Sequence, residues 1–245
     1  MSAIEDYERA ISSEATVILK AALPGQWDAI DDRLRLLLNG GAEPLDQKYA
    51  RNREDFIRRL FLEFTEITES LDRLRDIAVY VRRFPYSDTS ISKSAHLRYH
   101  VENYLNEVYI LRNRLEAYLK VVVRLYKQDA RSSRVKTITA TLQDTMPRTF
   151  AVPTAVRGKH VHRQRYSDAD LERLRLLELL KDDSNHWASA YESTYLDVRR
   201  LKRAWIERMN RQIDKLLELY FAYLKQLLFD PQGALILPQD LVPSA

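Results

Sequence analysis

Apolar residues recur with alternating spacings of four and three from Leu97 to Leu125, and this repeat constrains the fold more than any other feature of the sequence. On an α-helix these residues line one face, so the helix needs a partner along that whole face. Because the flanking segments are short enough to fold neighbouring helices back, we expect an antiparallel bundle seam rather than an extended coiled coil. The repeat consists of Leu97, Val101, Tyr104, Val108, Leu111, Leu115, Tyr118, Val122 and Leu125.

The helical period continues through most of the remaining chain. Only 5 glycines and 8 prolines occur in 245 residues, which disfavours sandwiches, barrels and glycine-loop nucleotide folds and favours long uninterrupted helices. The predicted helices cover residues 2–21, 26–39, about 47–83, about 92–128, 132–146, a short segment after Ser167, and about 186–229.

The predicted fold class is therefore all-α. We expect an elongated antiparallel helical bundle with long helices and an irregular basic loop between its third and last parts. No clean linker is evident, so residues 1–245 are predicted to form a single domain. In it, 48–229 form the bundle core, 1–41 add accessory N-terminal helices, and 230–245 form a loosely docked tail.

Several kinds of site are excluded. With 0 cysteines the chain has no disulfide, thiolate nucleophile, zinc finger or iron–sulfur cluster. Walker A, Rossmann and nucleophile-elbow motifs are absent, and no long apolar run could span a membrane. The N-terminus is acidic and polar, unlike a signal peptide. We expect a cytoplasmic protein that uses no metal or cofactor and does not insert into a membrane.

Positive charge is concentrated in one segment. Residues 131–165 hold eight basic residues and one acid, Asp144, so this segment has a net charge of +7 and the rest of the chain has −3. A local excess of positive charge suits a partner that carries phosphates, such as RNA or a nucleotide. The alternative is that the segment is only a solvated loop.

Within this segment, residues 147–166 contain two prolines and a glycine and lack a helical stripe, which predicts an irregular loop. Arg157 and His162 lie in it with four residues between them. A guanidinium can hold a phosphate through two oxygens, and an imidazole can transfer a proton near neutral pH. Together they are a minimum set for metal-free cleavage of RNA, in which the 2′-hydroxyl oxygen attacks the adjacent phosphorus.

This arrangement of Arg157, four residues and His162, late in an all-α chain, resembles the motif of the higher eukaryote and prokaryote nucleotide-binding (HEPN) superfamily. The segment 100–119, rich in Tyr, Asn and Arg, is also similar to an early helix of that bundle, and the resemblance covers about 48–229. Many members are metal-independent ribonucleases of toxin–antitoxin and antiviral systems, and others are non-catalytic. Gly158 stands where the family often has Asn.

The resemblance implies an RNA endonuclease in which Arg157 contacts the phosphate and His162 is the general acid and base. Family dimers place two motifs face to face, so it also implies a homodimer whose second motif supplies the second proton-transfer group. A role as a toxin or defence effector, held in check by an antitoxin or regulatory protein, follows in the same way. The predicted substrate-binding residues are Lys159, His160, Arg163 and Arg165.

Two further histidines have the spacing of metal ligands on one helix face. These are His96 and His100, but no third ligand is evident, and Leu97 stands where zinc proteases have Glu. We expect both to lie on the rim of the seam. The alternative is that they line the same cleft as the motif, together with Asn103 and Glu107.

Two roles next to the motif remain open. His160 is a second candidate for the base, because it lies nearer to Arg157 in sequence. Tyr166 either stacks on a nucleotide or packs as the hydrophobic staple of the following helix, and we favour the staple. That helix is predicted to have Ser167 as its N-cap and Asp170 in the capping-box position.

The sequence also allows functions without catalysis. One is a HEPN-like or other helical module whose basic loop binds nucleotide, RNA or an acidic protein surface. The other is a structural adaptor whose loop is only solvated. The geometry of Arg157 and His162 separates the enzyme from both.

Overall fold

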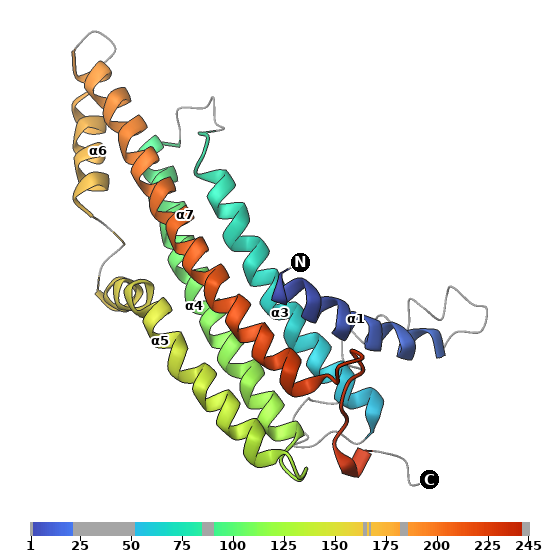
Figure 1. The fold of residues 1–245 in the computed structure, drawn as a ribbon. Helices are drawn as coiled ribbons and strands as arrows, with labels where there is room; N and C mark the ends of the chain where they lie inside the picture. The colour runs from blue at the N-terminus through green and yellow to red at the C-terminus, as the bar shows by residue number, and fades with distance from the viewer. Residues whose placement is uncertain are drawn as a thin grey trace. The chain divides into compact units, whose positions relative to one another are not determined.

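A computed structural model describes residues 2–21, 52–84, 91–163, 166, 168–181 and 186–241, and its regular structure is helical (Figure 1). The predicted all-α class is confirmed. In these ranges, no helix combines the length and apolarity that a membrane span requires. The predicted helix at 26–39 lies outside the described residues. The helices are α1 (Ala3–Ala21), α3 (Arg53–Tyr80), α4 (Lys93–Leu125), α5 (Ser132–Arg163), α6 (Ala169–Leu180) and α7 (His186–Leu228), followed by the 3₁₀ turn η1 (Gln239–Leu241).

The repeat in α4 is buried along its whole length. Of its nine residues, Leu125 is the most exposed, at 9%, and the other eight are at 0%. The predicted stripe from Phe56 to Val81, which covers α3 and the residue after it, is buried as well. The spacing of apolar residues therefore correctly predicted which face of each helix is buried.

The course of α5 differs from the prediction. We expected a helix over 132–146 followed by an irregular basic loop over 147–166, but the helix continues to Arg163. The predicted loop is therefore wrong through that residue.

Packing explains why α5 continues through its prolines. Met146 and Phe150 are 1% and 0% exposed and extend the buried stripe past Pro147, and Pro153 is itself buried. A proline inside a helix costs about 3 kcal/mol, and burying a Met or Phe side chain contributes about 1.5–3 kcal/mol. The two effects are of similar size, so buried side chains offset the prolines that the sequence pattern indicated as helix ends.

The chain forms two compact units. Unit 1 comprises Met1–Thr68, Asn113–Pro147 and Lys215–Ala245, and unit 2 comprises Glu69–Arg112 and Arg148–Asp214. The boundaries fall inside α3, α4, α5 and α7 rather than in loops, which is why composition showed no linker.

Aromatic side chains from four helices form the centre of unit 1. The ring of Tyr7 in α1, fully buried, has its centroid 5.4 Å from that of Phe64 in α3 and 5.1 Å from that of Phe221 in α7. The hydroxyl of Tyr7 is hydrogen-bonded to the hydroxyl of Tyr118 in α4. A helix expected to be accessory therefore supplies a central residue of this core.

The tail after α7, expected to be loosely docked, makes specific contacts within unit 1. A turn in which Gly233 has a φ of 86° brings Phe229 and Leu235 together in an antiparallel bridge. Glycine suits this position because other residues rarely adopt a positive φ. Further hydrogen bonds join the Tyr126 hydroxyl to the Ile236 carbonyl, Arg131 to the Leu237 carbonyl, and the Gln239 amide to Asp129.

In unit 2, α4 and α7 run parallel. Lys93, at the start of α4, donates to Glu192 at 2.7 Å, and the hydroxyl of Tyr104, three turns on, donates to Asn210 Oδ1 at 2.6 Å. Helix α6 lies alongside the first part of α7 in the opposite direction (Figure 1). Its Glu178 accepts a hydrogen bond from Tyr191 of α7.

The buried face of α7 departs from the predicted stripe. Trp187 and Leu201, expected in the core, are 43% and 51% exposed. Lys202 and Ile206 are buried instead, at 9% and 0%. A straight helix drifts from a strict seven-residue repeat, and the pairing of Lys202 with acids of unit 2 fixes the rotation here.

We predict that Tyr7→Phe lowers the free energy of unfolding by about 1–3 kcal/mol, because it leaves the Tyr118 hydroxyl buried without its partner. The double variant Tyr7→Phe/Tyr118→Phe removes both polar groups and should regain part of that stability. Urea unfolding of both singles and the double measures this, with the exposed Tyr223→Phe as the control. Strictly additive effects in the double variant would contradict the prediction.

Candidate functional site

The predicted catalytic motif lies in the last turns of α5. The backbone from Arg157 to Arg163 is helical, and the side chains of Arg157, Lys159, His160, His162 and Arg163 lie outside the described residues, as does Arg165 altogether. On an α-helix, positions five apart differ by about 140° around the axis. The convergence of Arg157 and His162 on one phosphate stays a prediction.

The chain just after the motif is held by a polar network in unit 2. The backbone amide of Tyr166 donates to Glu102 Oε1 of α4 at 3.1 Å, and its hydroxyl donates to Asp168 Oδ2 at 2.7 Å. Lys202 of α7 donates to Asp168 at 2.7 Å and to Asp170 at 2.9 Å. The motif therefore ends next to a point that is tied to both α4 and α7.

Asp168, rather than the predicted Ser167, is the N-cap of α6. Its carboxylate accepts from the Leu171 amide at 3.0 Å, and Asp170 pairs with Lys202 instead of closing a capping box. Burial alone would raise the pKa of Asp168, but hydrogen bonds from Lys202, Tyr166 and the Leu171 amide outweigh it and lower that pKa. The cap is an anion, which suits the positive end of the helix dipole.

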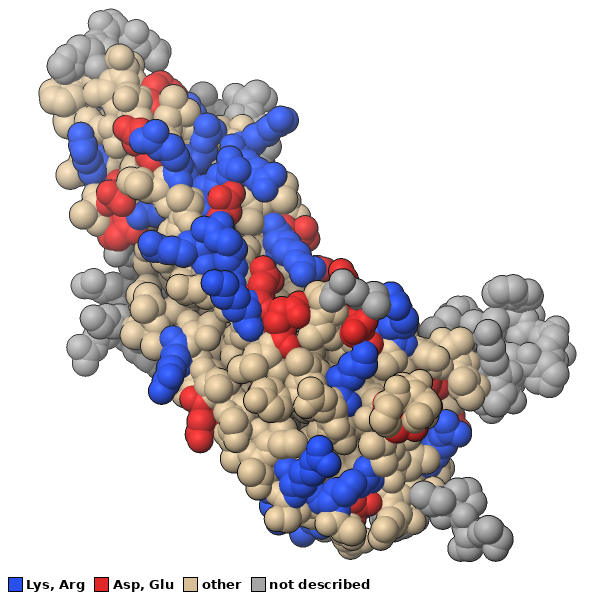
Figure 2. Space-filling view, viewed as in Figure 1, with Lys and Arg blue, Asp and Glu red and all other residues tan. Residues whose placement is uncertain are grey.

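A second feature of unit 2 is an arginine-lined depression of about 310 Å³, which we call the arginine hollow. Two of its arginines have an acidic partner: Arg200 pairs with Asp197 at 3.1 Å, and Arg203 with Glu207 at 2.7 Å. Figure 2 shows Lys and Arg side chains gathered over the first half of α7. The hollow is lined by Arg82, Leu196, Asp197, Arg199, Arg200 and Arg203.

The chemistry of this hollow suits phosphate. Guanidinium groups stay charged at any physiological pH and bind two phosphate oxygens at once. Arg82 forms no ion pair with an acid in the described part of the chain, and Arg199 stacks over the Tyr195 ring at 5.2 Å. Sequence reasoning missed this site, although four cations in the five residues Arg199–Arg203 were a visible signal.

His96 and His100 face the end of α3. Their rings are 4.5 Å apart, with Phe84 5.3 Å from His96 and Tyr80 5.6 Å from His100. Burial lowers the pKa of His96, and burial together with His96 lowers the pKa of His100 to about 4. Both are therefore neutral near pH 7. Over the residues with described positions, no group of three or more ligating side chains forms a metal site.

The two histidines and Tyr166 contact different faces of α4. Glu102, which holds Tyr166, follows His100 by two residues and is therefore about 200° further around the helix. The histidines contact α3 on their own face. The alternative in which they line one cleft with the motif stays a prediction, because the side chains of the motif lie outside the described residues.

Comparisons with protein-family models, with curated proteins and with solved structures gave no match to this chain. The functional assignment rests on the residues described above and on the motif.

We predict that the histidine pair makes folding sensitive to acid. The folded pKa of His100 is about 4, below the ordinary value of 6.5, so the unfolded chain takes up its proton first as the pH falls. The free energy of unfolding should therefore fall between about pH 6.5 and pH 4 more steeply in the wild type than in His100→Gln. Urea unfolding across this range measures the difference, in which carboxylates common to both proteins cancel. If the free energy of unfolding falls equally with pH in both proteins, the lowered pKa of His100 is refuted.

Proposed function

We propose that this protein is an RNA-binding, metal-independent endonuclease of the HEPN type, with Arg157 and His162 as its catalytic residues. The observation that supports it is the placement of this motif in the same compact unit as the arginine hollow. Unit 2 then carries the residues proposed to cleave a phosphodiester bond. It also carries a surface that can bind the neighbouring phosphates of the same strand.

The proposed chemistry is transesterification. Neutral His162 takes the proton of a ribose 2′-hydroxyl, whose oxygen attacks the adjacent phosphorus. Arg157 stabilises the negative charge on the phosphoryl oxygens. The bond to the 5′-oxygen breaks, and that oxygen leaves with a proton from a second acid, which a second copy of the motif in a homodimer would supply. The products are a 2′,3′-cyclic phosphate and a 5′-hydroxyl.

The network around Asp168 supports this proposal by fixing the chain next to the motif. Tyr166 lies four residues after His162 and is bonded to Glu102 and Asp168. Lys202, only 9% exposed, completes the network from α7. Positioned groups lower the entropic cost of reaching the transition state.

A second candidate function is binding without cleavage, and the arginine hollow favours it because phosphate binding there does not require the motif. Gly158, where related motifs often have Asn, points the same way. In this case the protein is a helical module that holds RNA or a nucleotide. A toxin or defence role with an antitoxin partner would then not involve catalysis by this protein.

The first test is cleavage of a mixed pool of structured and single-stranded RNA in EDTA. We expect wild type to make fragments that end in 2′,3′-cyclic phosphate, and Arg157→Ala and His162→Ala each to lower the rate by at least about 100-fold. His160→Ala tests the second candidate base, and Arg173→Ala, an exposed arginine of α6, is the matched control. Cleavage by both motif variants at the wild-type rate would refute the enzyme. Binding without cleavage by the wild type would favour the module.

The second test concerns the hollow. We expect Arg82→Ala/Arg199→Ala to weaken RNA binding and to reduce the slope of log K against log salt. For single-stranded RNA the reduction should be about 0.7 for each phosphate that the variant no longer neutralises. Fluorescence anisotropy at several salt concentrations measures this slope. The control is Arg173→Ala/Arg175→Ala, which removes two exposed charges of α6. Equal slopes for the hollow variant and wild type would exclude the hollow from RNA binding.

A further inference from the structure

Unit 1 carries a basic groove of its own, which we call the α4–α5 groove. It has a volume of about 340 Å³ and is an open depression between the end of α4 and the start of α5. The residues that line it include three cations, Lys120, Arg124 and Lys136, and no acid. Its remaining lining is made by Gln143 and by small or apolar side chains such as Val123 and Ala140.

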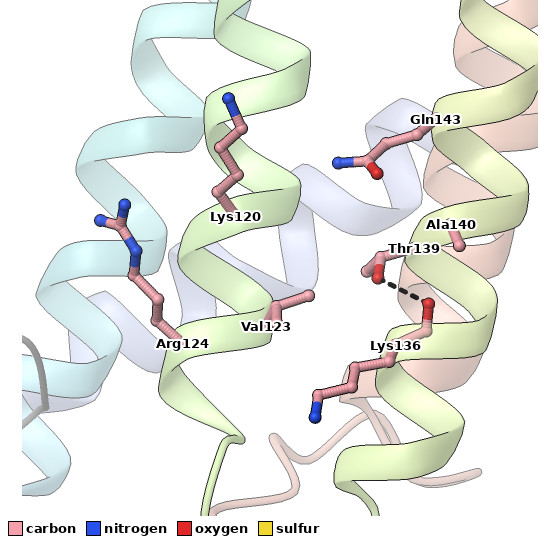
Figure 3. A pocket seen from close by; sticks show the side chains of 7 residues that line it. All are labelled: Lys120, Val123, Arg124, Lys136, Thr139, Ala140 and Gln143. Atoms are coloured by element: carbon pink, nitrogen blue, oxygen red, sulfur yellow. Dashed lines mark hydrogen bonds between the residues drawn. The ribbon is translucent and has the colours of Figure 1, made fainter.

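Figure 3 shows how these side chains are arranged. Lys120 from α4 and Gln143 from α5 lie on opposite sides of the groove, and Lys136 extends from α5 toward α4 below them. Arg124 extends on the other side of α4, toward α3. Lys120, Lys136 and Gln143 are therefore the polar groups available to one ligand in the groove.

The two lysines differ from several cations of unit 1 that have acidic partners. Arg53 pairs with Glu14, Arg59 with Asp55, Arg131 with Asp129 and Lys225 with Asp6, at 2.7–3.2 Å. Neither Lys120 nor Lys136 forms an ion pair with an acid that the structure describes.

Acidic groups near the groove do not neutralise it. Glu63 of α3 interacts with Arg124, and burial followed by repulsion from Glu66 nevertheless raises the pKa of Glu63. Asp144 adjoins Gln143 in sequence and is exposed. The groove keeps two positive charges that the described acids of its own unit do not pair.

We propose that the α4–α5 groove binds the phosphate backbone of RNA, as a contact separate from the arginine hollow. Lys120 and Lys136 each supply a compact ammonium charge for a phosphate, and the Gln143 amide can donate to a phosphate oxygen or a ribose hydroxyl. An open groove of this size accommodates a passing nucleotide. No aromatic side chain lines it, so binding should depend little on base sequence.

This inference rests on the proposed function in one respect, namely that RNA is the ligand. It does not depend on cleavage. The groove contributes by holding the strand through charge, and its removal should appear in affinity and in salt dependence rather than in the chemistry at Arg157 and His162.

The experiment measures binding of a fluorescein-labelled single-stranded RNA to the full-length chain by anisotropy, in EDTA and from 50 to 400 mM salt. All proteins carry His162→Ala so that the probe stays intact. The test variant is Lys120→Gln/Lys136→Gln. The matched control is Arg134→Gln/Lys215→Gln, which removes two exposed charges of unit 1 outside the groove.

We expect the slope of log K against log salt to be less steep by about 1.4 in the groove variant than in its parent protein. Binding at 0.1 M salt should weaken by more than about tenfold. The control should keep the slope of its parent protein. Circular dichroism melting checks that both fold alike.

The outcomes separate the two proposals. A reduced slope in the groove variant alone supports the groove, whether or not the wild type cleaves RNA. RNA binding that is equal in the groove variant and its parent overturns the groove and leaves the proposed function standing. RNA binding by neither overturns both. Competition by polyglutamate as strong as by unlabelled RNA overturns the choice of RNA and indicates an acidic protein surface.

Discussion

The structure depends on tyrosines that are buried together with their hydroxyl groups. A phenol removed from water must find a hydrogen-bond partner, and an unpaired one costs about 1–3 kcal/mol. In unit 1 the hydroxyls of Tyr7, Tyr118, Tyr126 and Tyr220 are all bonded, and most of these bonds join separate elements. Tyr7 joins α1 to α4, Tyr220 joins α7 to the Leu115 carbonyl of α4, and Tyr126, just after the end of α4, bonds to the tail. Apolar packing brings the helices together, and the hydroxyls select one arrangement among those that packing allows.

In the described part of unit 2, more buried polar atoms lack a hydrogen-bond partner than in unit 1. The Tyr104 hydroxyl is bonded to Asn210, but several buried atoms have no hydrogen-bond partner among the residues described, including Nδ1 of His100, Oγ1 of Thr154 and the hydroxyl oxygen of Tyr195. Unsatisfied polar atoms lower local stability and are frequent near functional sites. The motif and the arginine hollow belong to this same unit. Unit 1 is therefore the better-satisfied core, and unit 2 holds the residues proposed to act on RNA.

Sequence reasoning succeeded where one physical effect dominated and failed where two competed. The repeat from Leu97 to Leu125 predicted the buried face of α4, because nothing opposes apolar burial along it. In α5, the prolines opposed the burial of Met146 and Phe150, and periodicity was followed only as far as Leu142. The site residues Lys202 and Asp168 were missed because their pairing joins positions 34 apart, which no local pattern reveals.

Extending α5 changes what the basic segment can do. Residues 131–165 carry a net charge of +7, and much of that charge was expected on an irregular loop. Helical positions at different spacings lie on different faces of a helix, and the unit boundary after Pro147 divides the segment. Lys136 belongs to the α4–α5 groove of unit 1, whereas Arg157 and its neighbours belong to unit 2 with the hollow.

This division bears on how a polyanion would be held. A flexible basic loop adapts to any acidic partner, but charges fixed on rigid helices favour a ligand whose own charges are regularly spaced. The hollow supplies planar guanidinium groups and the groove supplies ammonium groups, so the two surfaces differ in the geometry of the charges they offer. A phosphate chain repeats the same charge at each nucleotide, so it can pair both with guanidinium groups and with ammonium groups. A protein surface would need an acidic residue placed to match each of these cations.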